Sequence, residues 1–140
     1  MPIPLADFIR FVSEHSLGVV STFDAERGPE AALLTFVPLP DGDVLFDTQV
    51  SSRKLHNILA DPRVALVIGT TEESSIQVEG VASLPRDEVE QRAWAHAYEE
   101  RFPDSQSADR AFTMVRLHPH WLRHYFVGGC LHEGDVTWAR

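Results

Sequence analysis

The sequence contains one cysteine, one lysine and no long apolar run, and each scarcity excludes a class of protein. With Cys130 alone, one chain can form neither an internal disulfide nor a cysteine-based metal cluster. No stretch approaches the roughly 18 apolar residues that a membrane span requires, and the first residues lack the basic and apolar regions of a secretion signal. We therefore expect a cytoplasmic protein with no membrane partner.

Positive charge is also scarce. The formal net charge is −9, and the acidic residues are spread along the chain. Such a chain repels a phosphodiester backbone, so we expect no nucleic-acid partner. An anionic ligand would need a local basic site, and the single lysine, Lys54, forms the only adjacent basic pair with Arg53.

The composition that remains is that of an ordinary packed domain. Hydrophobic residues make up 44% and charged residues 24% of the 140 residues. A chain of this length buries roughly two thirds of its unfolded surface around one core. We expect a single domain over residues 1–140.

Hydrophobic periodicity predicts an amphipathic helix first and then an antiparallel meander. The helix is expected over residues 4–15 and the three strands over residues 17–23, 30–39 and 44–49. On the third strand Val44, Phe46 and Thr48 share the apolar face, because side chains alternate along a strand.

The second half of the chain predicts two further helices and at least three further strands. A short helix follows Ser51 and Ser52 and stops at Pro62, and another is expected over residues 86–102. Strands are expected over residues 63–71, covered on both sides, and 75–84, with a bulge or bend at Gly80. Residues 112–127 form an edge strand or two strands broken at Pro119, and the tail allows one more. These elements predict an all-β or α+β fold, a closed barrel with peripheral helices.

The most informative segment runs from Thr48 to Lys54. A strand end carrying Thr48 passes through a short loop into a helix whose first turn holds Ser52, Arg53 and Lys54. Two hydroxyls, the amides of the helix start, a guanidinium and an ammonium can converge there on one phosphate. The alternative is that the serines cap the helix while the two cations are solvated.

The order of elements around this segment resembles the pyridoxamine 5′-phosphate oxidase-like FMN-binding split barrels, over residues 15–127. In that family a Ser-Arg-Lys opens a helix after a strand ending in aromatic-x-Thr, which matches Phe46, Asp47 and Thr48 followed by Ser52, Arg53 and Lys54. The resemblance implies a six-stranded antiparallel split barrel of Greek-key type with peripheral helices. It also implies FMN as cofactor, with its phosphate at Thr48, Ser52, Arg53 and Lys54.

The resemblance extends to positions along the flavin. Ala32, Leu33, Leu34 and Thr35 would line the ribityl chain and the ring, with Ala32 in place of an arginine of the true oxidases. Ser75 and Gln77 would approach the flavin from the second subunit, which implies a homodimer with the cofactor at the subunit interface. The implied function is an FMN-dependent oxidoreductase that transfers a hydride to or from a small-molecule substrate, with no catalytic acid or base identified.

The C-terminal residues leave other functions open. Arg116 and Pro119 fit the closing strand of the family, but Val127 to Cys130 stand where the true oxidases have an Arg-x-His segment, which argues against pyridoxamine-phosphate oxidation. The Gly-Gly ending is similar to that of split barrels related to heme-degrading oxygenases, with His124 or His132 as the candidate heme ligand. A non-catalytic flavin carrier or sensor and a deazaflavin-binding protein are further alternatives. We expect no metal site, because isolated strand histidines are more often solvated.

Overall fold

The computed structural model describes residues 3–139, which form three helices and eight strands; residues 1–2 and 140, the ends of the predicted domain, lie outside this range. The helices are Leu5–Glu14 (α1), Arg53–Ala60 (α2) and Glu88–Arg101 (α3). The strands are Leu17–Asp24 (β1), Gly28–Thr35 (β2), Val37–Pro38 (β3), Val44–Gln49 (β4), Arg63–Ile68 (β5), Ser74–Ser83 (β6), Phe112–Phe126 (β7) and Gly129–Asp135 (β8).

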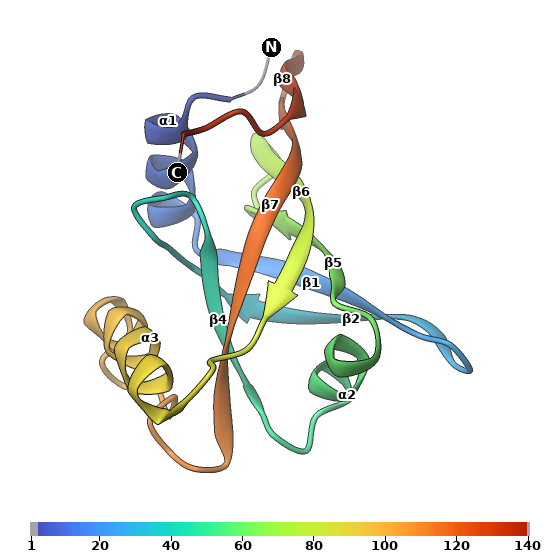
Figure 1. Cartoon of the computed structure of the whole chain (residues 1–140). Helices are drawn as coiled ribbons and strands as arrows, with labels where there is room; N and C mark the ends of the chain where they lie inside the picture. Colours follow the sequence, from blue (N-terminus) through green and yellow to red (C-terminus); the bar gives the residue numbers. More distant parts are fainter. Residues whose placement is uncertain (1–2, 140) are drawn as a thin grey trace.

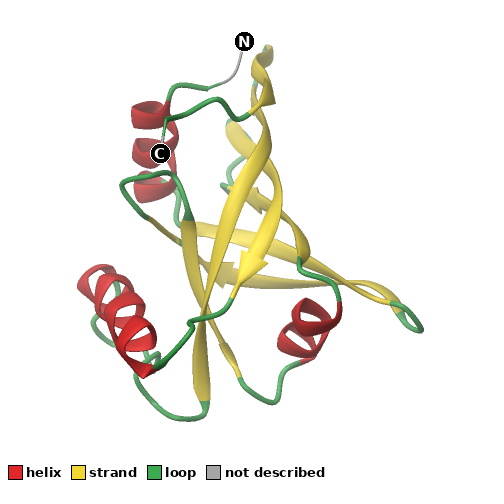
Figure 2. Ribbon diagram, in the orientation of Figure 1, coloured by secondary structure: helices red, strands yellow, loops and turns green. Residues whose placement is uncertain are grey.

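All eight strands belong to one antiparallel sheet with the order β2-β1-β5-β6-β7-β4-β3, and β8 pairs with β7. The first and last strands of this order, β2 and β3, are joined in the chain by the single residue Phe36. The sheet therefore curls back toward itself, with its strands crossing at steep angles (Figure 1). The helices lie at its periphery (Figure 2). This is the split barrel that the family resemblance implies, although the described residues form eight strands in place of the six expected.

The main difference in the strands is a corner at Phe36. The predicted strand over residues 30–39 is two strands, of which β2 pairs with β1 and β3 pairs with β4. Both antiparallel pairings of the predicted meander are thus confirmed, although its middle strand bends. The corner is buried: Phe36 has no exposed surface, and its amide donates to the Ser16 carbonyl at 2.8 Å.

The barrel interior is filled by rows of paired side chains from neighbouring strands. One row runs across β1, β5, β6 and β7 through Val20, Leu66, Val78 and Leu122, each at most 2% exposed. Because side chains alternate along a strand, the residues between them point to the outer face. The prediction that the strand at residues 63–71 is covered on both sides is wrong for the single chain, since Val67 is 43% exposed.

The middle of β7 contains the predicted bulge. The register between β6 and β7 shifts between Glu79 and Gly80, which confirms the irregularity expected at Gly80. A Cβ atom on Gly80 would overlap the carbonyl oxygen of His118, so only glycine fits this close approach.

The expectation that Pro119 marks an edge strand or a break is wrong, because β7 continues through it between β6 and its other partners. Pro119 pairs with Gly80 at the register shift, after the last residue that pairs with β4 and before the first that pairs with β8. Proline has no amide hydrogen to donate, and Pro119 lies where β7, on the edge away from β6, has no strand partner between the end of β4 and the start of β8.

The two ends of the described chain lie together beside α1 (Figure 1). Trp138 packs against Phe8 with ring centroids 5.1 Å apart, and its Nε1 donates to the Ile3 carbonyl at 2.8 Å. Strand β8 is the additional short strand that the tail allowed. Within residues 3–139, no helix is long and apolar enough to cross a membrane.

Candidate cofactor-binding site

The end of β4 and the start of α2 bring two predicted phosphate ligands together. Thr48 is 3% exposed, and its Oγ1 lies 2.7 Å from Oγ of Ser52, the N-cap residue of α2. The Ser52 hydroxyl also accepts the Leu55 amide at 3.2 Å, so the capping role of this serine is present as well. One hydrogen joins the two hydroxyls, and the other remains to be donated to a ligand.

The two cations follow directly in the first turn of α2. The Arg53 side chain is 70% exposed, and Lys54 is half-buried. The amides of this first turn have no carbonyl within the helix to bond, and the helix dipole adds partial positive charge. Thr48, Ser52, Arg53 and Lys54 thus place two hydroxyls and two cations at the junction of β4 and α2, and we call these four residues the α2 anchor.

An acidic side chain pairs with one cation of the α2 anchor, which the sequence reasoning missed. Arg53 Nη1 donates to Glu30 Oε2 at 2.8 Å. On β4, burial raises the pKa of the Asp47 carboxyl, and its backbone hydrogen bond and the charge of Lys54 act in the opposite direction. Glu30 is 23 residues from Arg53, and no local motif in the sequence links the two.

Glu30 is held by two more donors. Its oxygens accept from Arg27 at 3.1 and 3.2 Å and from Asn57 Nδ2 at 2.8 Å. The bonds from Arg27 and then from Asn57 lower the pKa of Glu30 from 4.5 to about 2, against the effect of burial. Asn57 is 1% exposed and also donates to Thr22 Oγ1 at 2.9 Å, so α2 is pinned to β1 and β2.

The four residues predicted to line the flavin do not share one face. Ala32 and Leu34 point inward and pack against the core, whereas Leu33 is 60% exposed on the outer face. Thr35 ends β2, and its Oγ1 lies 2.6 Å from the hydroxyl of Tyr98 on α3. Only alternate residues of this strand can therefore face one ligand.

A hollow of about 430 Å³ opens beside Thr35. It is lined by Asp47 and Tyr98, with Arg101 and residues 102–106 around it. Burial raises the pKa of the Tyr98 phenol, partly offset by the bond to Thr35. The sequence gives no local signal for this role of Tyr98, because its bond to Thr35 spans 63 residues. We refer to this hollow as the Thr35 pocket.

Ser75 and Gln77 lie elsewhere, on the outer face of the sheet. They line a hollow of about 300 Å³ with Val67, Arg123 and Tyr125, and no residue of the α2 anchor takes part. One row of cross-strand pairs runs over this face: Gln77 lies opposite Val67, Val67 opposite Val19, and Val19 opposite Leu33. Leu33 and Gln77 thus belong to one cross-strand row on the outer face of the sheet.

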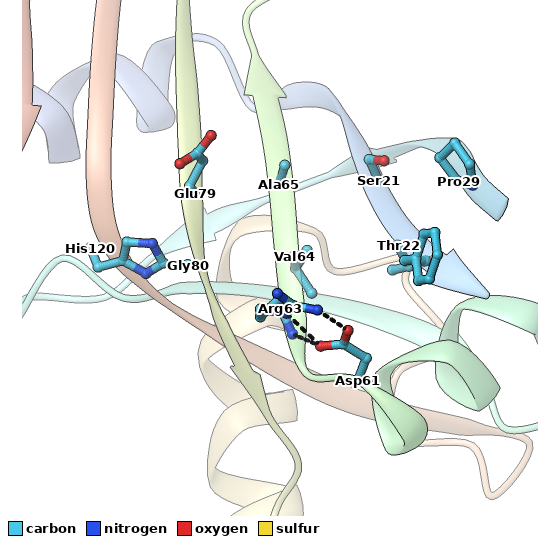
Figure 3. Close-up of a pocket in the computed structure, with 11 residues that line it drawn as sticks. Ser21, Thr22, Pro29, Asp61, Arg63, Val64, Ala65, Glu79, Gly80 and His120 are labelled. Carbon is cyan, nitrogen blue, oxygen red and sulfur yellow. Dashed lines mark hydrogen bonds and ion pairs between the residues drawn. The ribbon is translucent and has the colours of Figure 1, made fainter. Parts of the chain in front are cut away.

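Another hollow of about 390 Å³ lies where β1, β5 and β6 meet the C-terminal end of α2 (Figure 3). Figure 3 shows its Arg63 turned toward Asp61, with Nη2 and Oδ2 2.6 Å apart. Arg63 lowers the pKa of Asp61 to about 2. The Arg63 guanidinium is thus already paired with a carboxylate of the same hollow.

The two histidines named as heme-ligand candidates lie near each other beside α1. The rings of His124 and His132 are 6.3 Å apart and nearly parallel, at 19°. They line a hollow of about 400 Å³ with Phe11 and Phe126. Burial lowers the pKa of His124, whose Nε2 lies 3.0 Å from Ser74 Oγ. Across residues 3–139, no three His, Cys, Asp or Glu side chains are grouped as a metal site requires.

The curled antiparallel sheet, with helices at its periphery and donors gathered where β4 meets α2, defines a split-barrel protein. The chain belongs to the pyridoxamine 5′-phosphate oxidase family, whose model matches residues 6–126. No curated protein matches the chain significantly.

Solved structures share the fold at low sequence identity. A conserved hypothetical protein from Mycobacterium tuberculosis has a TM-score of 0.74 at 20% identity, covering 89% of this chain and 85% of that one. General stress protein 26 from Bacillus anthracis has a TM-score of 0.68 at 21% identity, covering 93% and 99%. A heme binding protein from Mycobacterium smegmatis has a TM-score of 0.68 at 19% identity, covering 98% of this chain but 59% of that protein.

Proposed function

We propose that this protein binds FMN through the α2 anchor and serves as an oxidoreductase for a small substrate. The observation that carries the proposal is the meeting of the Thr48 and Ser52 hydroxyls, 2.7 Å apart, directly before Arg53 and Lys54 in the first turn of α2. Hydroxyl, amide, guanidinium and ammonium donors suit the oxygens of a phosphate monoester. Membership of the pyridoxamine 5′-phosphate oxidase family supports the same cofactor.

The residues of the chain would bind and orient the two reactants. The α2 anchor would hold the phosphate of the cofactor. When bound, FMN supplies the acceptance and donation of a hydride. In the Thr35 pocket, the Tyr98 hydroxyl and the Asp47 carboxyl would orient a polar substrate.

The test of the cofactor is an absorption spectrum of the purified protein before and after addition of FMN, with a thermal melt at each step. We expect flavin bands or a melting temperature that rises with FMN concentration, because a ligand that binds only the folded state stabilises it. Absence of both the bands and the shift would refute the proposal. Riboflavin, which lacks the phosphate, is the matched ligand control and should shift the melt less.

We further propose that the protein acts as a homodimer. The outer face exposes large apolar side chains that a single chain leaves in water: Leu17, Phe23, Leu33, Val67 and Val81. Large apolar patches on a protein surface mark interaction sites. A second copy on this face would bring Ser75 and Gln77, which lie apart from the α2 anchor in their own chain, toward the cofactor of its partner.

Replacement of Val67 by glutamate should convert the dimer to a monomer. Val67 lies in the cross-strand row of the outer face, and burial of a carboxylate against the apolar side chains of a second copy is costly. The mass in solution, measured by light scattering after size exclusion, reports the change. Val89→Glu, at a 70% exposed position on α3, adds the same charge and should leave the mass unaltered. A wild-type protein that is already monomeric would overturn the proposal.

Heme binding is a second candidate function. The hollow between His124 and His132 combines two imidazoles with Phe11 and Phe126, which suits a flat aromatic ligand. A heme binding protein also shares the fold. In the spectrum described above, a Soret band after addition of heme that changes in His132→Ala would favour this function, and an FMN-dependent melt would favour the flavin.

A flavin that binds but is not reduced or reoxidised with any substrate would indicate a carrier or sensor.

A further inference from the structure

We propose that Glu30 is a specificity-determining residue of the α2 anchor, a carboxylate that competes with a bound phosphate for Arg53 and keeps FMN dissociable. The inference rests on the proposed binding of FMN at this place. It concerns how tightly the phosphate is held, and therefore whether the flavin stays with the protein or exchanges with flavin in solution.

The competition follows from the position of the carboxylate. Glu30 Oε2 accepts from Arg53 Nη1 at 2.8 Å, a distance typical of a charge-assisted hydrogen bond. A phosphate that bonds to the same guanidinium must either displace this contact or lie within a few ångströms of the carboxylate. In both cases the interaction of Arg53 with Glu30 lowers the net contribution of Arg53 to the free energy of phosphate binding.

Glu30 is also less able to move than Arg53. Its side chain is 18% exposed, whereas that of Arg53 is 70% exposed. Asn57, itself 1% exposed, donates to Oε1 of Glu30 at 2.8 Å and to Thr22 at 2.9 Å. The carboxylate is thus fixed to β1, β2 and α2, and where the phosphate displaces the contact it is the exposed guanidinium that moves.

The negative charge of Glu30 persists at physiological pH, since Arg27, Asn57 and Arg53 favour the carboxylate. A dianionic phosphate bound to Arg53 therefore lies beside a carboxylate that stays charged, and like charges at such separations repel.

The test compares Glu30→Gln with the wild type in equilibrium titrations with FMN and with riboflavin. Glutamine keeps the shape of the side chain and an oxygen for Asn57, but removes the charge. FMN affinity should rise roughly ten-fold, the effect of one nearby like charge in a well-solvated site. Riboflavin affinity should stay as it is, because riboflavin carries no phosphate. Glu26→Gln removes an exposed charge from the same hairpin and is the matched control.

The outcomes separate the two proposals. Equal FMN affinity of Glu30→Gln and wild type, in a protein that binds FMN, overturns the role of Glu30 and leaves FMN binding standing. Equal gains for FMN and riboflavin also overturn it, since the change would not act on the phosphate. An FMN affinity of Glu26→Gln that rises as much would show a general charge effect and overturn the specific role. Failure of both the wild type and Glu30→Gln to bind FMN refutes the proposed function and, with it, the inference.

Discussion

Simultaneous replacement of Arg53 and Lys54 by alanine is expected to weaken FMN binding by roughly two to four orders of magnitude. Each cation would contribute a charge-assisted hydrogen bond to the phosphate, and such bonds contribute about 1.5–3 kcal/mol each. Two of them amount to about 3–6 kcal/mol, and every 1.4 kcal/mol is ten-fold in affinity. Fluorescence titration with FMN measures the loss, and the weaker binding of riboflavin should change little.

The double variant should remain folded, because the Arg53 side chain is 70% exposed and Glu30 keeps its bonds to Arg27 and Asn57. The matched control is Arg86→Ala combined with Arg92→Ala, which removes two exposed cations at α3 and gives the same net charge. Loss of FMN binding in both proteins would indicate a general effect of charge. Wild-type affinity in Arg53→Ala/Lys54→Ala would place the flavin, if it binds, away from the start of α2.

The features of the fold that the sequence predicted depend on neighbouring residues. The helix expected over residues 4–15 is observed at Leu5–Glu14, and that over 86–102 at Glu88–Arg101, because apolar periodicity and capping are local signals. The same holds for the start of the α2 anchor. Thr48 and Ser52 are four residues apart, so a strand end followed by a helix start places them together whatever the rest of the chain does.

The features that the sequence did not predict depend on contacts between distant segments. The bond between Thr35 and Tyr98 spans 63 residues, and that between Glu30 and Asn57 spans 27. The residue type of Thr35 or of Glu30 does not indicate which distant residue will bond to it. Pro119 was misjudged because the rule against proline in inner strands assumes a regular ladder, whereas the register shift opposite Gly80 removes the need for its amide. The apolar run through Val67 indicated a strand covered on both sides, and the single chain covers only one.

The corner at Phe36 also depends on distant contacts, and it gives the largest expected effect on stability. Phe36 separates β2 from β3, and its fully buried ring meets the ring of Phe46 edge-on with centroids 5.7 Å apart. A Cβ atom at Gly18 would lie 3.0 Å from the same ring, so the aromatic side chain is enclosed on the β1 side as well.

Phe36→Ala should therefore destabilise the protein by roughly 3–5 kcal/mol, the loss that accompanies a cavity where a buried aromatic ring was. Urea unfolding followed by tryptophan fluorescence measures the change in the free energy of unfolding. Leu59→Ala, at a 68% exposed position on α2, should change it by less than about 0.5 kcal/mol. A Phe36→Ala variant as stable as Leu59→Ala would mean that the corner is held by its backbone bond to Ser16 and by β3, and that the ring contributes little to closing the barrel.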